Sequence, residues 1–315
     1  MSKSNICVMG SFVVDLAARA DHLPVKGETV FGSAFVMGPG GKGSNQAVAA
    51  RRAGAEVVLI TKIGKDVFGQ VAKDSFIKEG LYSPCIFEDP DLETGIALIM
   101  VDKESANCIL VAPGACTNIQ EEEIEACREE FAACDILLTQ LEVNLPATVQ
   151  AIEMAKETGT TVILNPAPVQ EIPDGLLEKV DIITPIEIEA AILAGIPAIE
   201  TIEDCRQATA YFLEQGVSKV VITWGERGVY CNDGNRELHI PVLPVKAIDT
   251  TGAGDAFNGC FAAALAHGKD FFDAAVYATV GAGISVTRFG TAPSTAYECE
   301  IEPLYEQHKS TLLKK

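Results

Sequence analysis

The stretch DTTGAGDAFNG, residues 249–259, joins two segments with different hydrophobic patterns. Residues 240–248 are apolar and predict a strand, whereas residues 256–266 repeat apolar side chains near a 3.6-residue period and predict a helix. Between them, Gly252 and Gly254 allow the backbone to turn sharply and to approach a ligand closely.

The start of the expected helix forms an anion site with a carboxylate inside it. Free N–H groups in a first helical turn bind anions, and the positive end of the helix dipole keeps Asp255 ionised. A phosphate held there predicts phosphoryl transfer: Asp255 takes the proton of the acceptor hydroxyl, and the amides of Gly252, Ala253 and Gly254 stabilise charge on the transferring group. The alternative is a plain glycine-rich turn with Asp255 as a capping residue. The combination with Asp249 and two threonines favours the site.

Apolar strand patterns and amphipathic helix patterns alternate along much of the chain, which predicts a mostly parallel sheet covered on both faces. We therefore expect a three-layer α/β/α sandwich. No linker divides the chain, so residues 1–315 are expected to form one domain. Strands are expected at residues 6–9, 57–63, 136–140, 161–165, 181–184 and 217–223, with further β structure over 229–245. Helices are expected at residues 45–53, 66–79, 145–158, 187–194, 203–215 and 271–285.

Two extended segments at residues 13–20 and 30–36, and a hairpin over residues 95–112, do not fit this alternation. We expect them to form a small separate β-sheet, contributed by two insertions at about 12–38 and 94–113. The alternative is that they are extra edge strands of the main sheet.

The composition excludes several kinds of partner and compartment. A net charge of −20 argues against nucleic acid, whose phosphates need basic partners. No apolar run approaches the ~20 residues of a membrane span, and residues 6–9 are too short for a signal peptide. Ten cysteines without a C-x-x-C pair, such as Cys7, Cys108, Cys231 and Cys260 within apolar runs, predict reduced core residues of a cytoplasmic protein.

A second glycine-rich stretch, GPGGKGSNQ at residues 38–46, lies upstream. Its backbone can crowd a small ligand, and Lys42 and Asn45 can donate to hydroxyl groups. It does not fit the phosphate-loop pattern G-x-x-x-x-G-K-[ST], because Gly43 follows Lys42. Together, in this order and spacing, the two stretches resemble the signatures of the ribokinase (PfkB) family of sugar kinases, and the resemblance covers nearly the whole chain.

This resemblance implies an ATP-dependent phosphotransferase with an alcohol group as acceptor, acting on the primary 5-hydroxyl of D-ribose in ribose catabolism. It implies Mg²⁺ and K⁺ as cofactors. The small sheet would be a lid over the sugar, and the lids of two subunits would clasp each other in a homodimer. Two alternatives remain open: a kinase for 2-deoxyribose or another small sugar, and a non-catalytic protein that senses a sugar or a nucleotide.

The resemblance also assigns site residues. Those expected to contact the sugar are Ser11, Phe12, Val13, Asp15, Gly40, Gly41, Lys42, Gly43, Asn45, Glu142 and Asp255. Those expected to contact ATP are Ile186, Thr223, Gly225, Glu226, Arg227, Gly228, Gly254, Asp255 and Thr279. Those expected to surround K⁺ are Asp249, Thr251, Ser285, Arg288, Gly290 and Ser294, while Glu189 would act on Mg²⁺ indirectly.

The residues alone leave other roles open for some of these positions. Asp15 could be an exposed strand residue, Glu142 an acid before a helix, and residues 223–228 a simple hairpin turn.

Three positions depart from the family pattern. Ile186 replaces an asparagine of the Asn-x-x-Glu motif, although Glu187 could substitute for it. Thr279 replaces an asparagine near the adenine. Val13 stands where ribokinases usually carry an asparagine in the sugar pocket, which predicts relaxed discrimination between ribose and 2-deoxyribose.

Overall fold

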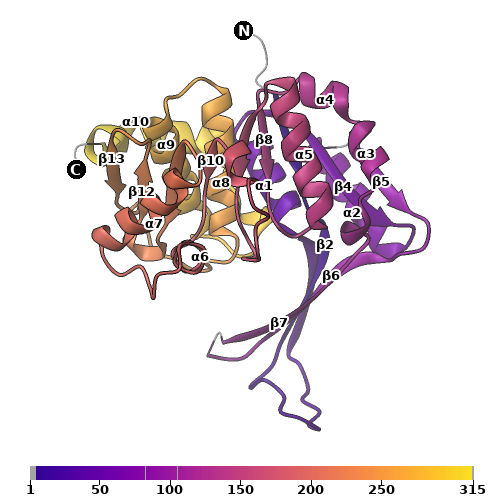
Figure 1. The fold of residues 1–315 in the computed structure, drawn as a ribbon. Coiled ribbons are helices and arrows are strands. Elements are labelled where there is room, and N and C mark those ends of the chain that lie inside the picture. Colours follow the sequence, from indigo (N-terminus) through magenta and orange to yellow (C-terminus); the bar gives the residue numbers. More distant parts are fainter. Residues whose placement is uncertain (1–4, 82, 105, 314–315) are drawn as a thin grey trace.

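The structure is a computed structural model that describes residues 5–81, 83–104 and 106–313. It contains a nine-stranded sheet in the order β13-β12-β11-β10-β9-β8-β1-β4-β5 and a separate four-stranded sheet in the order β3-β2-β6-β7. Figure 1 shows the second sheet projecting away from the body of the molecule. The predicted fold class, an α/β/α sandwich with a small extra sheet, is therefore confirmed.

Strands of the main sheet pair in parallel, except at one edge, where β11, β12 and β13 pair antiparallel. The parallel strands are short and almost wholly buried, as expected when helices cover both faces. The strands of this sheet are β1 (Asn5–Met9), β4 (Glu56–Gly64), β5 (Ile86–Asp89), β8 (Ile136–Thr139), β9 (Thr161–Leu164), β10 (Ile182–Ile183), β11 (Lys219–Thr223), β12 (Val229–Asn232) and β13 (Glu237–Ile240).

Two hydrophobic cores, one on each face of the main sheet, produce the three layers. In β1, Ile6 and Val8 belong to one core, whereas Cys7 and Met9 belong to the other, because strand side chains alternate between faces. The helices of the first core are α1 (Lys42–Arg52), α2 (Val67–Glu79), α8 (Ala253–Ala266), α9 (Phe271–Ser285) and α10 (Glu298–Leu312). Those of the second are α3 (Glu121–Glu125), α4 (Arg128–Ala132), α5 (Leu145–Thr158), α6 (Glu187–Ala194) and α7 (Ile202–Glu214). Short 3₁₀ turns are η1 (Ala115–Asn118), η2 (Leu177–Lys179), η3 (Gly225–Arg227) and η4 (Ala292–Ser294).

Local capping signals set several of the helix ends. The Asp66 carboxylate accepts a hydrogen bond from the Gly69 amide at 2.7 Å, and Gly80 ends α2 at φ 70°, as the sequence predicts. Asn144 precedes α5 but does not cap it with its side chain. Its amide instead pairs with both backbone groups of Ile119, which ties the loop before α3 to α5.

The small sheet is formed by the predicted segments, with one shift in register. Its strands are β2 (Val13–Arg19), β3 (Ala34–Gly40), β6 (Thr94–Val101) and β7 (Asn107–Gly114). The strand predicted at 30–36 instead runs from 34 to 40, because its pairing with β2 aligns Ala34 with Arg19 and Gly40 with Val13. The glycine-rich stretch thus begins inside a strand, and α1 begins at Lys42 rather than at residue 45.

The strand predicted over residues 240–248 is wrong beyond Ile240, where β13 ends. Pro241 and Pro244 interrupt this apolar run, and proline cannot donate to a sheet ladder. Residues 241–252 instead form an irregular segment that leads to α8.

All ten cysteines are free, and eight of them are buried, consistent with small core residues. Cys108 differs from the prediction, because it lies exposed on β7 of the projecting sheet, and Cys299 is also exposed. Among the described residues, no helix combines the length and apolar character that crossing a membrane requires.

Candidate active site

The first turn of α8 has the backbone geometry expected of the predicted anion site. Gly252 precedes the helix at φ 75°, a left-handed conformation that glycine adopts without strain, and Asp255 is buried one turn further on. A Cβ placed on Gly254 would find no heavy atom within 4 Å, so this part of the turn borders open space. The backbone amides of the turn are therefore accessible to a bound anion.

The carboxylate of Asp255 is held by two amide side chains. Asn45 Nδ2 donates to Oδ2 at 3.0 Å, and Gln46 Nε2 donates to Oδ1 at 2.9 Å. Burial raises the pKa of Asp255, against the opposing effects of nearby Lys42 and of these two hydrogen bonds. The carboxylate is thus fixed in direction and poised to accept a proton.

A second carboxylate, that of Glu142 in the loop after β8, contacts the first residue of α1. Its Oε2 accepts hydrogen bonds from the Lys42 amide at 2.9 Å and from the Ser11 hydroxyl. Gly41 makes this contact possible, because it turns the chain into α1 at φ 89° and a Cβ there would lie 2.8 Å from the Ser11 carbonyl oxygen. Burial tends to lower the pKa of Lys42, but the charges of Asp255, Glu142 and Glu189 raise it, so its ammonium stays protonated.

Asp15 faces the same group of charges from β2. Burial, together with Glu142 and Asp255, raises the pKa of Asp15 to about 6. Val13 lies two residues earlier and therefore on the same strand face, whereas Val14 lies on the opposite face, buried in the core. Asn45 Oδ1 is buried and has no hydrogen-bond partner among the described residues, so it can accept from a ligand hydroxyl.

Gly40, Gly43 and Phe12 were also predicted to contact the sugar, but their side chains offer no hydrogen-bond donor. A Cβ on Gly40 would clash with the Asp15 carboxylate, and one on Gly43 would lie 2.5 Å from the Gly10 backbone. The Phe12 ring does not face the site: it is fully buried in an edge-on contact with Phe76, 5.2 Å between ring centroids.

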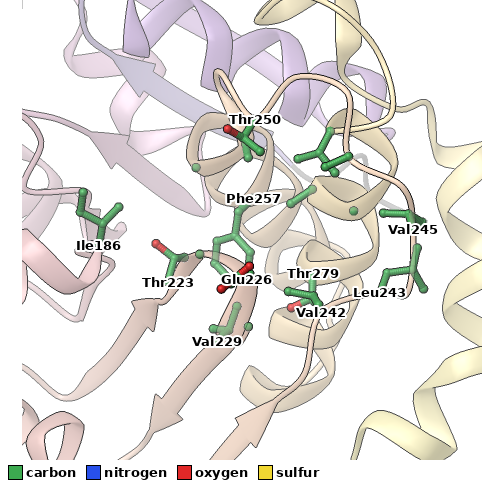
Figure 2. A pocket seen from close by; sticks show the side chains of 18 of the residues that line it. Ile186, Thr223, Glu226, Val229, Val242, Leu243, Val245, Thr250, Phe257 and Thr279 are labelled. Carbon is green, nitrogen blue, oxygen red and sulfur yellow. The ribbon is translucent and has the colours of Figure 1, made fainter. Parts of the chain in front are cut away.

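A pocket of about 690 Å³ borders the first turn of α8, at Ala253 and Gly254. Figure 2 shows Phe257 between Ile186 and Thr223 on one side and Leu243 and Val245 on the other. The residues predicted to contact ATP that line it are Ile186, Thr223, Gly225, Glu226, Gly228, Gly254 and Thr279.

Two residues predicted to contact ATP do not line this pocket. Asp255 lies beyond its edge. The Arg227 guanidinium packs 5.0 Å above the Trp224 ring and donates to the Glu200 carbonyl at 2.6 Å, so its side chain is engaged elsewhere.

The sequence analysis did not predict one wall of the pocket. It is apolar and comes from the irregular segment before α8 and from the end of α9. The sequence did hold a signal for this wall. The residues after Ile240 are apolar, but Pro241 and Pro244 among them argue against a strand, so their side chains were available to line a pocket. The residues of this wall are Val242, Leu243, Val245, Ala247, Ala282, Gly283 and Val286.

The residues predicted around a monovalent cation lie in two segments, the loop before α8 and the stretch from the end of α9 to η4, and hydrogen bonds to Asp249 connect the two. Asp249 Oδ1 accepts from the Thr251 amide at 2.9 Å, and its Oδ2 accepts from the Gly290 amide at 3.0 Å. Burial opposes ionisation of Asp249, but these hydrogen bonds lower its pKa overall. The hydroxyls of Ser285 and Ser294 donate to backbone carbonyls.

Two more side chains, those of Arg288 and Glu189, were predicted to lie near K⁺ and to act on Mg²⁺, respectively. Arg288 is paired with Glu300, so its guanidinium is not free for a ligand. Glu189 Oε2 accepts from the Ile186 amide at 3.0 Å at the start of α6, and burial raises the pKa of Glu189.

Comparisons with known proteins show which family this chain resembles. Residues 3–296 match the pfkB family carbohydrate kinase. A ribokinase from Haemophilus influenzae is 39% identical over 292 residues, covering 93% of this chain and 95% of that protein. A deoxyribokinase from Salmonella typhi is 37% identical over 291 residues, covering 92% and 95%.

Solved structures give the same result. A ribokinase crystal structure from Thermotoga maritima aligns with a TM-score of 0.88 at 34% identity, covering 96% of this chain and 99% of that chain. The Arabidopsis thaliana ribokinase complexed with ribose and ATP aligns with a TM-score of 0.89 at 27% identity, covering 97% and 99%.

The chain belongs to the pfkB family of carbohydrate kinases. It is accordingly a phosphotransferase that acts on a sugar hydroxyl, and the family and reaction type predicted from the two glycine-rich stretches are confirmed.

Proposed function

We propose that this protein transfers the γ-phosphoryl group of ATP to the primary 5-hydroxyl of D-ribose. The observation that carries the proposal is the position of Asp255, at the helix turn between the 690 Å³ pocket and the cluster of Asp15, Lys42, Asn45 and Glu142. The ribokinases among its relatives, one of them complexed with ribose and ATP, support both substrates.

In the proposed reaction, Asp255 accepts the proton of the sugar hydroxyl as that oxygen bonds to the γ-phosphorus of ATP and ADP departs. The open turn at Gly252, Ala253 and Gly254 directs backbone amides at the charge on the transferring group. Asp15 and Glu142 accept hydrogen bonds from sugar hydroxyls, and Asn45 offers its free Oδ1.

The pocket beside α8 suits a nucleotide. Its apolar wall, including Leu243 and Val245, can cover a flat base, and its other end opens on the helix turn that would hold phosphate. We propose that Mg²⁺ accompanies ATP, with Glu189 acting on it indirectly. Burial is the main cause of the raised pKa values of Asp255 and Glu189. Each carboxylate also lies near a like charge, Glu142 for Asp255 and Glu187 for Glu189, so an added cation would favour their ionised forms. When bound, Mg²⁺ would neutralise part of the phosphate charge.

A second candidate substrate is 2-deoxyribose. Val13 presents an apolar side chain on the strand face that carries Asp15, and a deoxyribokinase is among the similar proteins. The test of both substrates is an ADP-release assay against a panel of pentoses, hexoses and nucleosides. Turnover confined to hexoses or nucleosides would overturn the proposal.

The pH dependence of kcat/KM for the sugar is expected to reflect the ionisation of Asp15. Its ionised form accepts from hydroxyls, and its pKa is raised to about 6, so kcat/KM should fall about tenfold per pH unit below about pH 6. Glu142, Asp255 and Lys42 face the same group, so the assay should follow KM and kcat separately from pH 5 to 8. An Asp15→Asn variant should lack the part of the acidic decline that comes from KM. A flat wild-type KM across this range would contradict the assignment.

We further propose a K⁺ site between the loops that Asp249 joins. An ion among their backbone oxygens would hold the α8 turn in shape, so activity should rise when K⁺ replaces Na⁺ or a bulky organic cation. Asp249→Ala should abolish this difference. Equal wild-type rates in all three salts would refute the site.

The projecting sheet is proposed to act as a lid and to clasp a second lid in a homodimer. Apolar side chains are exposed along it, among them Phe35 at 66%, Leu110 at 60% and Ile109 at 50%, and an apolar surface of this kind indicates a contact site. Light scattering at micromolar protein should give a dimer mass, and Leu110→Glu should give a monomer. A monomeric wild-type protein would count against the clasp.

We also propose that the chain acts as one kinase domain in the cytoplasm. The ten free thiols support a reducing compartment, where disulfides are rare.

A further inference from the structure

A buried chain of hydrogen bonds runs from Asp255 through side chains that do not line the pocket. Gln46 Nε2 donates to Asp255 Oδ1 at 2.9 Å and to Asn165 Oδ1 at 3.0 Å, while Gln46 Oε1 accepts from Gln140 Nε2 at 2.7 Å. Asn165 Nδ2 in turn donates to the Thr184 carbonyl at 2.9 Å. Each of these side chains is at most 9% exposed, so water competes little for these bonds.

Two fixed acceptors determine how the amides are oriented. The Thr184 carbonyl can only accept, so Asn165 must direct its Nδ2 towards it and its Oδ1 towards Gln46. Asp255, when ionised, can also only accept. Gln46 therefore has to present its NH₂ group to both Asn165 and Asp255, which leaves its oxygen for Gln140. Every hydrogen-bonding group of the Gln46 amide is satisfied in this single orientation.

A second branch returns to the same helix turn. The Thr184 hydroxyl donates to Asn258 Oδ1 at 2.5 Å, and Asn258 Nδ2 donates to the Gly254 carbonyl at 2.9 Å. The ends of β8, β9 and β10 are thus connected both to the Asp255 carboxylate and to the backbone turn of the predicted anion site.

We infer that Gln46 is a positioning residue for the phosphoryl transfer, one that fixes the carboxylate of Asp255 and is itself held by Asn165. This inference rests on the proposed role of Asp255 as the base. None of Gln46, Asn165 or Asn258 contacts the 690 Å³ pocket, so their effect on the reaction would be indirect. Removing the Gln46 donor leaves the buried carboxylate of Asp255 with Asn45 as its one remaining side-chain donor, so the carboxylate is less firmly oriented and easier to protonate.

The test compares Gln46→Met with the wild type. Methionine has nearly the same length and fills the same space but cannot donate. We expect kcat to fall about 10–100-fold, the equivalent of one charge-assisted hydrogen bond, with the KM for the sugar within about threefold. The acidic limb of the kcat profile should move to higher pH. Gln46→Glu, which adds a like charge beside Asp255, should move the limb further in the same direction and provides the test if the methionine variant does not fold.

Thr209→Val is the matched control for replacing a buried polar side chain by an apolar one. Thr209 is 1% exposed in α7, and its hydroxyl lacks a partner among the described residues. Because no hydrogen bond is lost, the thermal stability of Thr209→Val should equal or exceed that of the wild type, and its kcat and pH profile should stay unchanged. A folded Gln46→Met protein with more than half of the normal kcat and an unmoved acidic limb would overturn the inference. Asp255→Asn, measured in the same assay, separates the two hypotheses: if it keeps full turnover, the proposed base is wrong, and if it is inactive while Gln46→Met is normal, only the positioning role is wrong.

Discussion

Asp255→Asn is expected to lower kcat by about 10²–10⁴-fold, the usual contribution of a general base. Asparagine keeps the shape of aspartate and one of its two acceptor oxygens, but it cannot take the proton of the sugar hydroxyl. Binding of the sugar should change little, because Asp15, Lys42, Asn45 and Glu142 remain in place. The measurement is steady-state kcat by ADP release, with the sugar dissociation constant obtained by calorimetry.

Asp273→Asn is a matched control. Asp273 also lies in the first turn of a helix, α9, and burial and the nearby Asp270 raise its pKa too. Asp273 lines no part of the pocket, so the kcat of Asp273→Asn should equal that of the wild type. An Asp255→Asn protein that keeps more than half of the normal kcat would exclude Asp255 as the base.

Most strands and helices of the main body, and the mostly parallel pairing of its sheet, were predictable because their signals are local. The apolar run before Gly10 and the capping pair of Asp66 and Gly80 specify their elements through short-range chemistry. The segments of the projecting sheet were predictable as a separate unit because their pattern breaks the strand–helix alternation.

Features that depend on pairing over long distances were not predictable. The position of β3 is set by its alignment with β2, where only a glycine at position 40 leaves room for Asp15. The apolar run at 241–248 was mistaken for a strand, although Pro241 argues against one, and it forms a pocket wall instead.

The hydrogen-bond network around Asp255 was not predictable either, because it also depends on residues that are far apart in the sequence. Asp255, Lys42 and Asn45 stand in glycine-rich motifs that suggest a ligand. Gln46 stands in one of them as well, but its partner Asn165 is 119 positions away. No local pattern relates the two, so the role of Gln46 becomes visible only when the fold brings their amides together.

The choice between ribose and 2-deoxyribose is expected to depend on Val13. A site that hydrogen-bonds a hydroxyl rejects the analogue without it by ~10⁴–10⁵, because its buried polar group is left unpaired, whereas an apolar site rejects an added hydroxyl by only ~10². Val13 is 5% exposed and lies on the face that carries Asp15, and a Cβ on Gly95 would meet its Cγ1 at 2.9 Å. Its neighbour Val14 is buried in the core on the opposite face, so it cannot take the place of Val13 in the site.

We therefore expect both sugars to be phosphorylated, with kcat/KM values within about 10²-fold of each other. Val13→Asn should shift the ratio towards ribose, because an amide there would bond the 2-hydroxyl and be left unpaired by 2-deoxyribose. Val13→Ala is the control: it stays apolar, so the ratio should remain within the same range even if both rates fall. The measurement is kcat/KM for the two sugars in competition, with thermal melting to confirm that each variant is folded. A wild-type protein that uses ribose but shows no turnover of 2-deoxyribose would mean that Val13 only packs beneath the lid, and that the polar contacts of Asp15, Asn45 and Glu142 alone decide the sugar.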